Sequence, residues 1–368
     1  MVEPTREGWM APANAGSADM IRTPVPRPTW GTLFQRIGYG ALSLLIVFLV
    51  FLCDVSLSRY CEPGGLLLAN DSPSRFLRHA SATGWGQSLT ALLRRGSLVP
   101  LLTLTLMLVA AAEFVKLARQ RGAKPHDAFA YLMVALLIVS PWLSSAGWLG
   151  ERPAQVEGLY WSFMLTVASA VGLAFLTVLR GNPKDTFRDV GSTLAVILYV
   201  GLLGSFATQL RCSRDIPVQE GAWLLLIVVF VAKCTDIGGY LVGSAIGRHK
   251  LAPSISPGKS WEGLLGGFAC SALASGIVAW SGLSRSFRMA EGGESGFTAY
   301  WHPVVFGLLL SLIAQVGDLF ESCFKRDAGS KDSGRFFPRF GGILDLLDSL
   351  LPTLPVGWFL LTAVWGIG

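Results

Sequence analysis

Long runs of uncharged, mostly apolar residues constrain this chain more than any other feature. About 20 such residues are needed to cross the roughly 30 Å hydrocarbon layer of a bilayer, and the backbone in lipid must satisfy its own hydrogen bonds, which favours helices. Only 15% of the 368 residues are charged, against about 25% in soluble proteins. The sequence therefore predicts an all-α, polytopic integral membrane protein with about nine transmembrane helices, at 37–53, 97–112, 129–150, 158–179, 190–210, 221–232, 263–284, 295–317 and 349–368.

The chain is expected to divide into three parts. Residues 1–36 contain four Arg and several Pro and are predicted to form a disordered cytoplasmic arm. Residues 37–220 hold the N-terminal membrane helices, with an outer loop at 54–96, and residues 221–368 form a C-terminal catalytic membrane domain. The second and sixth runs are short unless their helices continue past Glu113 and Lys233. Ionisable residues placed there are costly and are usually functional.

The distribution of basic residues predicts the orientation. With the N-terminus inside and nine crossings, the inner segments hold 20 of the 30 Lys and Arg, and the outer loops hold 10. Such a bias favours a cytoplasmic N-terminus. The charged segments 233–262 and 318–348 then face the cytoplasm at the inner (cell) membrane. The net charge of +6 is attributed to contact with anionic lipid, and no nucleic-acid partner is expected.

Acidic residues cluster where the eighth run ends and the ninth begins. On a helix, Asp318, Glu321, Ser322 and Lys325 would share one face, because they stand at i, i+3, i+4 and i+7. Asp345 and Asp348 stand at i, i+3. We expect Asp318, Asp345 and Asp348 to converge around a hard cation such as Mg²⁺, since an all-oxygen carboxylate set suits it. The alternative is a helix that leaves the membrane and whose last turn is charged only because it is exposed to water.

Basic residues accompany these carboxylates. Lys325, Arg326 and Lys331 lie between them in the sequence. Carboxylates that hold Mg²⁺, together with Lys and Arg, are the groups that neutralise phosphate oxygens in phosphoryl or nucleotidyl transfer. Gly258, Lys259 and Ser260 resemble the end of a P-loop, but position 253 is Pro, so the segment is not a Walker A motif. A turn that carries Lys259 just before a helix can still hold phosphate.

The spacing of these residues resembles the phosphatidate cytidylyltransferase (CDP-diacylglycerol synthase) family. The resemblance extends from Asp236 to Asp348 and is carried by the 236–240 stretch, the 250–263 stretch, and Gly317, Asp318, Glu321, Ser322, Lys325, Arg326, Lys331, Asp332, Pro338, Gly341, Gly342, Asp345 and Asp348. Two positions depart from the family pattern. Phe340 stands where the family has His, and Leu346 stands where it has Arg.

The resemblance implies that CTP and phosphatidic acid, a membrane lipid, react to give CDP-diacylglycerol and pyrophosphate. It implies that Mg²⁺ is held by Asp318, Asp345 and Asp348, with a second cation such as K⁺ left open, as is a homodimer. Lys325 and Arg326 are expected to act in catalysis with the three Asp residues. The expected substrate-binding residues are Asp236, Ser256, Lys259, Ser322, Lys331 and Asp332.

Three other readings stay open. A transporter would place polar residues at the membrane midplane, whereas these charges cluster at one face. A related CTP-dependent lipid kinase would transfer the γ-phosphate to a lipid alcohol. A catalytically impaired homologue would explain Phe340 and Leu346, because neither side chain can bind phosphate.

Overall fold

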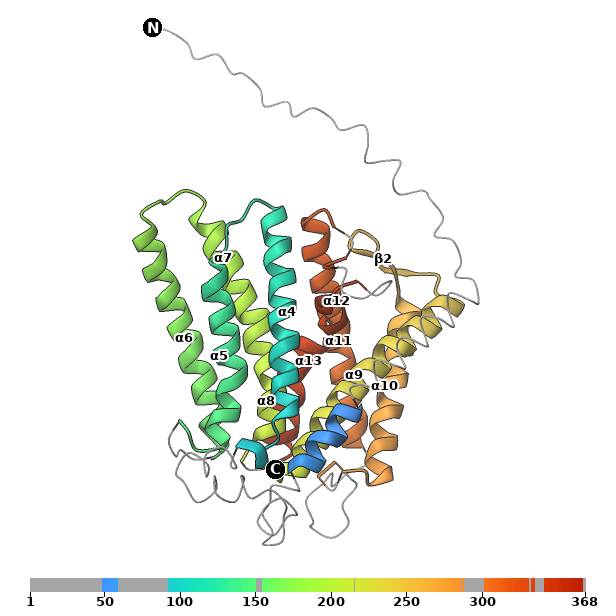
Figure 1. Cartoon of the computed structure of the whole chain (residues 1–368). Coiled ribbons are helices and arrows are strands. Elements are labelled where there is room, and N and C mark those ends of the chain that lie inside the picture. The colour runs from blue at the N-terminus through green and yellow to red at the C-terminus, as the bar shows by residue number, and fades with distance from the viewer. Residues whose placement is uncertain are drawn as a thin grey trace. The chain divides into compact units, whose positions relative to one another are not determined.

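A computed structural model describes residues 48–58, 92–149, 154–214, 216–284, 286–287, 301–330, 332–334 and 341–366. Within these ranges the chain is almost entirely helical and carries one two-stranded hairpin (Figure 1). The predicted arm at 1–36 and most of the predicted outer loop lie outside the described residues.

Eight helical segments are long and apolar enough to cross a membrane, counting the described residues alone. Each coincides with a predicted run. The first predicted run is described only from Phe48, where a short apolar helix, Phe48–Ser58, begins. The all-α, polytopic fold is thus confirmed. The helices are α4 (Leu98–Gln120), α5 (Asp127–Ser145), α6 (Ala154–Arg180), α7 (Thr186–Val196), η2 (Ile197–Leu202), α8 (Leu203–Cys212), α9 (Val218–Ile246), α10 (Trp261–Ser281), α11 (Trp301–Asp327), α12 (Ile343–Leu347), α13 (Leu350–Phe359) and η3 (Leu360–Val364).

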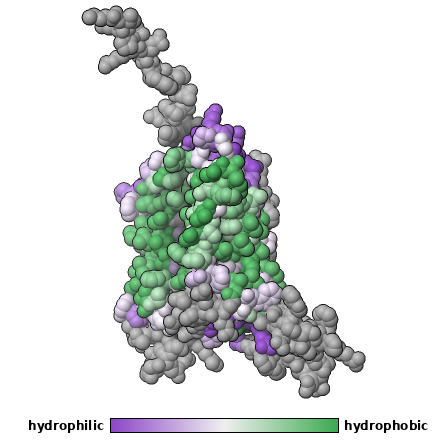
Figure 2. Space-filling view, turned by 90° about the vertical axis from the view of Figure 1, so that its left-hand side faces the viewer, coloured by the Kyte–Doolittle hydropathy of each residue, from purple (hydrophilic) through white to green (hydrophobic). Residues whose placement is uncertain are grey.

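Two of these spans continue past ionisable residues, as predicted. Helix α4 continues past Glu113 to Gln120, and α9 continues past Lys233 to Ile246. Figure 2 shows a broad hydrophobic band over the flank of the helices, with hydrophilic residues gathered towards its ends. Large apolar side chains of the described helices are exposed, for example Phe175 on α6 at 63% and Trp280 on α10 at 85%. Lipid is the solvent that makes such exposure favourable.

Glycines bring α9 and α10 into close contact. A Cβ atom on Gly238 would lie 2.6 Å from the carbonyl oxygen of Gly266, and one on Gly263 would lie 2.8 Å from that of Gly239. Small residues of this kind let membrane helices pack backbone to backbone. The antiparallel hairpin of β1 (Lys250–Ala252) and β2 (Ser256–Ser260) joins the two helices at the upper end in Figure 1. The close packing therefore fixes where the hairpin stands.

A buried ion pair joins four helices at the other end. Arg211 Nε lies 2.6 Å from Asp54 Oδ2, and both side chains are fully buried. Asp54 Oδ1 also accepts a hydrogen bond from Leu98 N at 2.7 Å, and Arg211 donates to Val218 O at 2.8 Å. These contacts connect helix Phe48–Ser58 and α8 to the first residues of α4 and α9.

The buried pair generates a stability prediction. We expect Arg211→Met to lower the free energy of unfolding by about 3–5 kcal/mol, because it leaves the Asp54 carboxylate buried without a counter-charge. Thermal unfolding of the full chain in detergent measures the effect. The matched control is Arg188→Met, since the Arg188 side chain is 53% exposed and exposed pairs contribute about 0–1 kcal/mol. Equal unfolding temperatures for the two variants would contradict the role given to the pair.

Candidate active site

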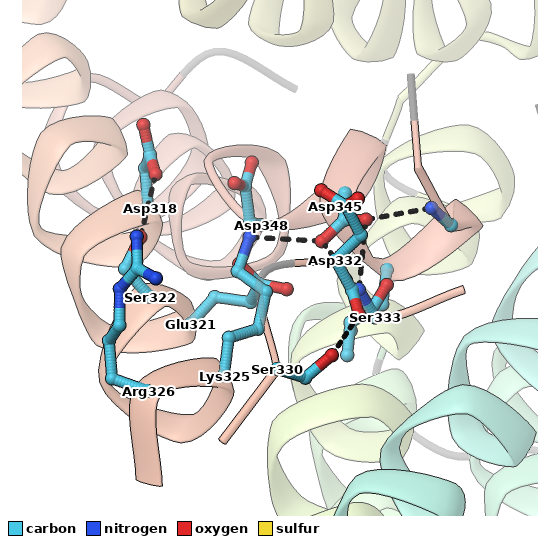
Figure 3. A network of polar contacts seen from close by, with 12 residues as sticks. Asp318, Glu321, Ser322, Lys325, Arg326, Ser330, Asp332, Ser333, Asp345 and Asp348 are labelled. Atoms are coloured by element: carbon cyan, nitrogen blue, oxygen red, sulfur yellow. Dashed lines mark hydrogen bonds and ion pairs between the residues drawn. The ribbon is translucent and has the colours of Figure 1, made fainter. Parts of the chain in front are cut away.

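The predicted site residues come from four elements that meet at the upper end of the molecule in Figure 1. These are the second half of α9, the β1–β2 hairpin, the last turns of α11, and α12. Figure 3 shows the carboxylates of Asp318, Asp348 and Asp345 in a row, with Asp348 between the other two. The charged groups of this row fall into two clusters.

The first cluster forms around Asp318. Lys259, on β2, places its Nζ 2.9 Å from Asp318 Oδ2 and 3.0 Å from Gln315 Oε1. The hydroxyl of Ser322 lies 3.5 Å from Asp318 Oδ1, one helical turn along α11 (Figure 3). Asp318 is 33% exposed and Lys259 17% exposed. The partly exposed carboxylate of Asp318 and the ammonium group of Lys259 are thus paired at the hairpin.

Asp348 belongs to this first cluster as well. A Cβ atom on Gly317 would lie only 2.5 Å from Asp348 O, so α11 and the end of α12 touch at the residue before Asp318. Among the charged groups, Asp318 and then Lys233 act most strongly on the Asp348 carboxylate. Asp318 and Asp348 are therefore brought together, although they are 30 positions apart in the sequence.

Lys233 anchors the same cluster from α9. Its Nζ lies 3.0 Å from Asp236 Oδ2, 3.0 Å from Ser349 Oγ and 3.0 Å from Leu346 O. The Ser349 hydroxyl donates to Asp236 Oδ2 at 2.9 Å. Position 346 contributes its carbonyl oxygen here. The departure from Arg to Leu therefore leaves this contact intact.

The second cluster forms around Asp345. Lys325 Nζ lies 2.9 Å from Asp345 Oδ1, Ser333 N lies 3.1 Å from Oδ2, and Gly342 N lies 2.7 Å from Oδ2. Lys325 also forms an ion pair with Glu321, whose side chain is fully buried. The sequence predicted one shared face for Asp345 and Asp348. In the structure α12 has five residues, the Asp345 carboxylate caps its first turn, and Asp348 directly follows its last residue with helical dihedral angles.

These positions bear on the predicted metal ligands. Among the described residues, no three His, Cys, Asp or Glu side chains form a group that could hold a metal ion. Mg²⁺ is commonly bound by only one or two carboxylates together with substrate phosphates, so Asp318 and Asp348 stay predicted ligands. Asp345 already accepts from three donors in this arrangement, so its place as a third ligand stays a prediction.

The remaining predicted residues lie around the two clusters. Arg326 donates from Nε to Ile255 O at 3.1 Å, which ties the end of α11 to the turn of the hairpin. Ser256 opens β2 opposite Ala252. Asp332 is exposed, and its carbonyl accepts from Ser330 Oγ at 2.8 Å. Lys331 and Phe340 lie outside the described residues.

Glu113 of α4 is a site residue whose role the sequence motifs do not reveal. Its Oε2 accepts from Leu344 N at 2.8 Å and from Ser333 Oγ at 3.2 Å. The carboxylate therefore caps the start of α12 and holds the segment that precedes it. The one sequence signal was an acidic residue inside an apolar run.

Two glycines make room for these carboxylates. A Cβ atom on Gly342 would lie 2.2 Å from Glu113 Oε2, and one on Gly341 would lie 2.1 Å from Asp345 Oδ2. Gly341 also has φ +87°, a conformation that residues with a Cβ rarely adopt. The Gly-Gly pair of the motif is thus explained by close approach of two acidic side chains.

Fold and site together define a polytopic membrane protein with a charged, phosphate-suited cluster at one membrane end. A family model described as the cytidylyltransferase family matches residues 78–364. Because the match covers well over half of the chain, the protein belongs to the cytidylyltransferase family.

Named relatives support the same assignment. The chain is similar to a phosphatidate cytidylyltransferase of Mycobacterium leprae, 37% identical over 185 residues, which are 50% of this chain and 54% of that protein. A phosphatidate cytidylyltransferase of Staphylococcus saprophyticus is 34% identical over 228 residues, 61% of this chain and 80% of that protein. One from Staphylococcus aureus is 36% identical over 200 residues, 53% of this chain and 69% of that protein. The chain spans about half the length of the mycobacterial relatives it matches.

The cap from α4 generates the next prediction. We expect Glu113→Ala to speed hydrogen–deuterium exchange in the 341–349 segment by roughly tenfold or more, because Leu344 N–H loses a charged acceptor and such bonds contribute about 1.5–3 kcal/mol. Glu113→Gln keeps an oxygen acceptor and should stay closer to the parent protein. Lys116→Ala, an exposed change on the same helix, is the control. Unchanged exchange in Glu113→Ala would show that the cap does not hold α12.

Proposed function

We propose that the protein is a phosphatidate cytidylyltransferase, which converts CTP and phosphatidic acid into CDP-diacylglycerol and pyrophosphate. The observation that carries the proposal is the pairing of Asp318 with Lys259 beside Asp348, at the membrane end of the bundle. A water-soluble nucleotide and a lipid headgroup can meet only at such a boundary. The family match and the names of the relatives support the same reaction.

The reaction needs an oxygen of the lipid phosphate to attack the α-phosphorus of CTP. A new P–O bond forms there, the bond from the α-phosphorus to the oxygen that bridges to the β-phosphate breaks, and pyrophosphate leaves with that oxygen. The lipid phosphate is already anionic near neutral pH, so no general base is required. The protein must instead bring two anions together and neutralise their oxygens.

The basic residues of the two clusters supply this neutralisation. Lys259, on β2, pairs with Asp318 in the first cluster. Lys325 pairs with Asp345 in the second cluster. In the proposed complex both lysines exchange part of their contact with carboxylates for contact with phosphate oxygens. Arg326 and Lys331 stay predicted contributors at the end of α11 and the segment after it.

Mg²⁺ is proposed as the cofactor, with Asp318 and Asp348 as the residues that would hold it and Asp345 as the predicted third ligand. When bound, it would supply Lewis-acid neutralisation of the phosphate oxygens. Ser322 and Asp236 stand beside these carboxylates and are proposed to line the nucleotide pocket, with Ser256 and Asp332 at its edge. A second cation such as K⁺ and a homodimer stay predictions.

The proposed location is the inner cell membrane, with the N-terminus and the site cytoplasmic. The eight apolar spans support a multi-pass membrane protein. The excess of Lys and Arg in the segments on the hairpin side supports that side as cytoplasmic.

The position of a radioactive label in CTP tests the reaction itself. With purified protein, phosphatidic acid and Mg²⁺, we expect label from the α-phosphate of CTP to enter the lipid and label from the γ-phosphate to stay in water-soluble pyrophosphate. Lipid extraction and chromatography measure both. In a parallel reaction that also contains diacylglycerol, transfer of the γ-label to this lipid alcohol would identify a kinase instead, and no transfer of either label would identify a catalytically impaired homologue.

Substitution of the carboxylates tests the site. Asp318→Asn and Asp345→Asn should each lower CDP-diacylglycerol formation by about 100-fold or more, because charge stabilisation at phosphate contributes several kcal/mol. Chelation of Mg²⁺ should abolish turnover, and added Mg²⁺ should restore it. Asp327→Asn, at the exposed end of α11, is the control and should retain activity. Full turnover in Asp318→Asn would contradict the proposed site.

A further inference from the structure

A polar cavity opens at the same membrane end as the candidate active site, away from its residues. It has a volume of about 150 Å³ and lies between the segment after α4, the end of α6 and the start of α7. We call it the headgroup pocket; its polar lining includes Lys124, His126, Arg180, Asn182, Lys184 and Asp189. Figure 1 shows the turn from α6 to α7 at the upper end, where α4 also ends.

A buried carboxylate builds the floor of the headgroup pocket. Asp189 is 6% exposed. Its Oδ1 accepts from Lys124 N at 2.7 Å and its Oδ2 lies 3.2 Å from an Arg180 guanidinium nitrogen. These bonds hold the segment after α4 against α7 and the end of α6. The negative charge of Asp189 is thereby compensated within the pocket wall.

The pocket retains an excess of positive charge. Its second carboxylate, Asp185, has Arg188 at 3.9 Å. Across the part of the chain that the structure describes, no ion pair is formed by the ammonium groups of Lys124 and Lys184. Two lysines that face a polar cavity without a carboxylate partner are suited to bind an anion, and phosphate oxygens are acceptors that match them.

The surface next to the headgroup pocket is apolar and faces lipid. Among the eight spans that the structure describes, α6 is the least buried. Only 17% of its most apolar stretch is buried, against 44% to 50% in the other seven. Val171 and Val178 are 65% and 77% exposed on α6, and the latter neighbours the lining residue Thr177. Phe187, at the start of α7, is 98% exposed. An apolar track along α6 therefore leads from the bilayer to the cavity.

We propose that the headgroup pocket binds the phosphate of an anionic phospholipid, with Lys124 and Lys184 on the phosphate and an acyl chain along α6. A free phosphate would use the lysines but not the apolar track. The pocket shares no residue with the two carboxylate clusters. Arg121, next to the lining residue Gly122, forms an ion pair with Asp327 at the end of α11, which places both sites at one membrane end.

Native mass spectrometry of the full chain in detergent tests this proposal. Phosphatidylglycerol is the anionic probe, and zwitterionic phosphatidylcholine is the reference lipid. We expect Lys124→Gln and Lys184→Gln each to weaken phosphatidylglycerol binding about fivefold, and the double variant about 25-fold, since each basic residue near a lipid phosphate contributes roughly that factor. Binding of phosphatidylcholine should change little.

Matched variants separate the proposal from its alternatives. Lys116→Gln removes one exposed charge from α4 outside the pocket and should bind phosphatidylglycerol like the parent protein. Lys124→Arg with Lys184→Arg keeps the charge and should preserve binding, which excludes misfolding as the cause of loss. Asp318→Asn should preserve it as well, whatever the fate of CTP turnover. Equal binding by the double Gln variant would overturn the proposal, and glycerol phosphate competing as well as the lipid would overturn the lipid as occupant.

Discussion

The pairing of lysine ammonium groups with carboxylates at the membrane boundary is the interaction on which the rest of the structure depends. Lys259 meets Asp318, Lys233 meets Asp236, and Lys325 meets Asp345. Lys259 and Asp318 join β2 to α11, and Lys325 and Asp345 join α11 to α12. The ion pairs therefore also position the hairpin, α11 and α12 relative to one another. An unpaired charge at this depth is costly, and a phosphate can take the place of a carboxylate without leaving a lysine uncompensated.

The two clusters differ in their surroundings. The cluster of Asp318 and Asp348 combines a carboxylate that is 33% exposed with one that is buried, beside a lysine of β2. The cluster of Asp345 is more enclosed, because the buried Glu321 and the cap from Glu113 surround it. The contacts of the second cluster fix the short helix α12, which Asp348 directly follows. The Gly-Gly pair serves this second cluster, since it lets the carboxylates of Glu113 and Asp345 approach the backbone.

Much of the fold was predictable, because lipid imposes a length and a hydropathy on each span. Eight predicted runs coincide with apolar helices, and the extensions past Glu113 and Lys233 follow from the same length requirement. The meeting of Asp318 with Asp348 was predictable from their places at adjacent helix ends. The partner of Glu113 was not, because it caps an amide 231 positions away. The backbone donors to Asp345 also escaped prediction, since helical spacing cannot show that Ser333 N and Gly342 N would lie at its carboxylate.

The contact of α4 with α12 has a consequence for how the chain tolerates change. The Glu113 carboxylate of the N-terminal helices packs against the backbone of Gly342 in the C-terminal motif, where a side chain would clash. This contact therefore needs both halves of the chain. A segment of the N-terminal bundle taken from a relative would have to bring its own acceptor at the place of Glu113. The two halves of this protein are therefore not interchangeable modules, and inherited variation in one is constrained by the other.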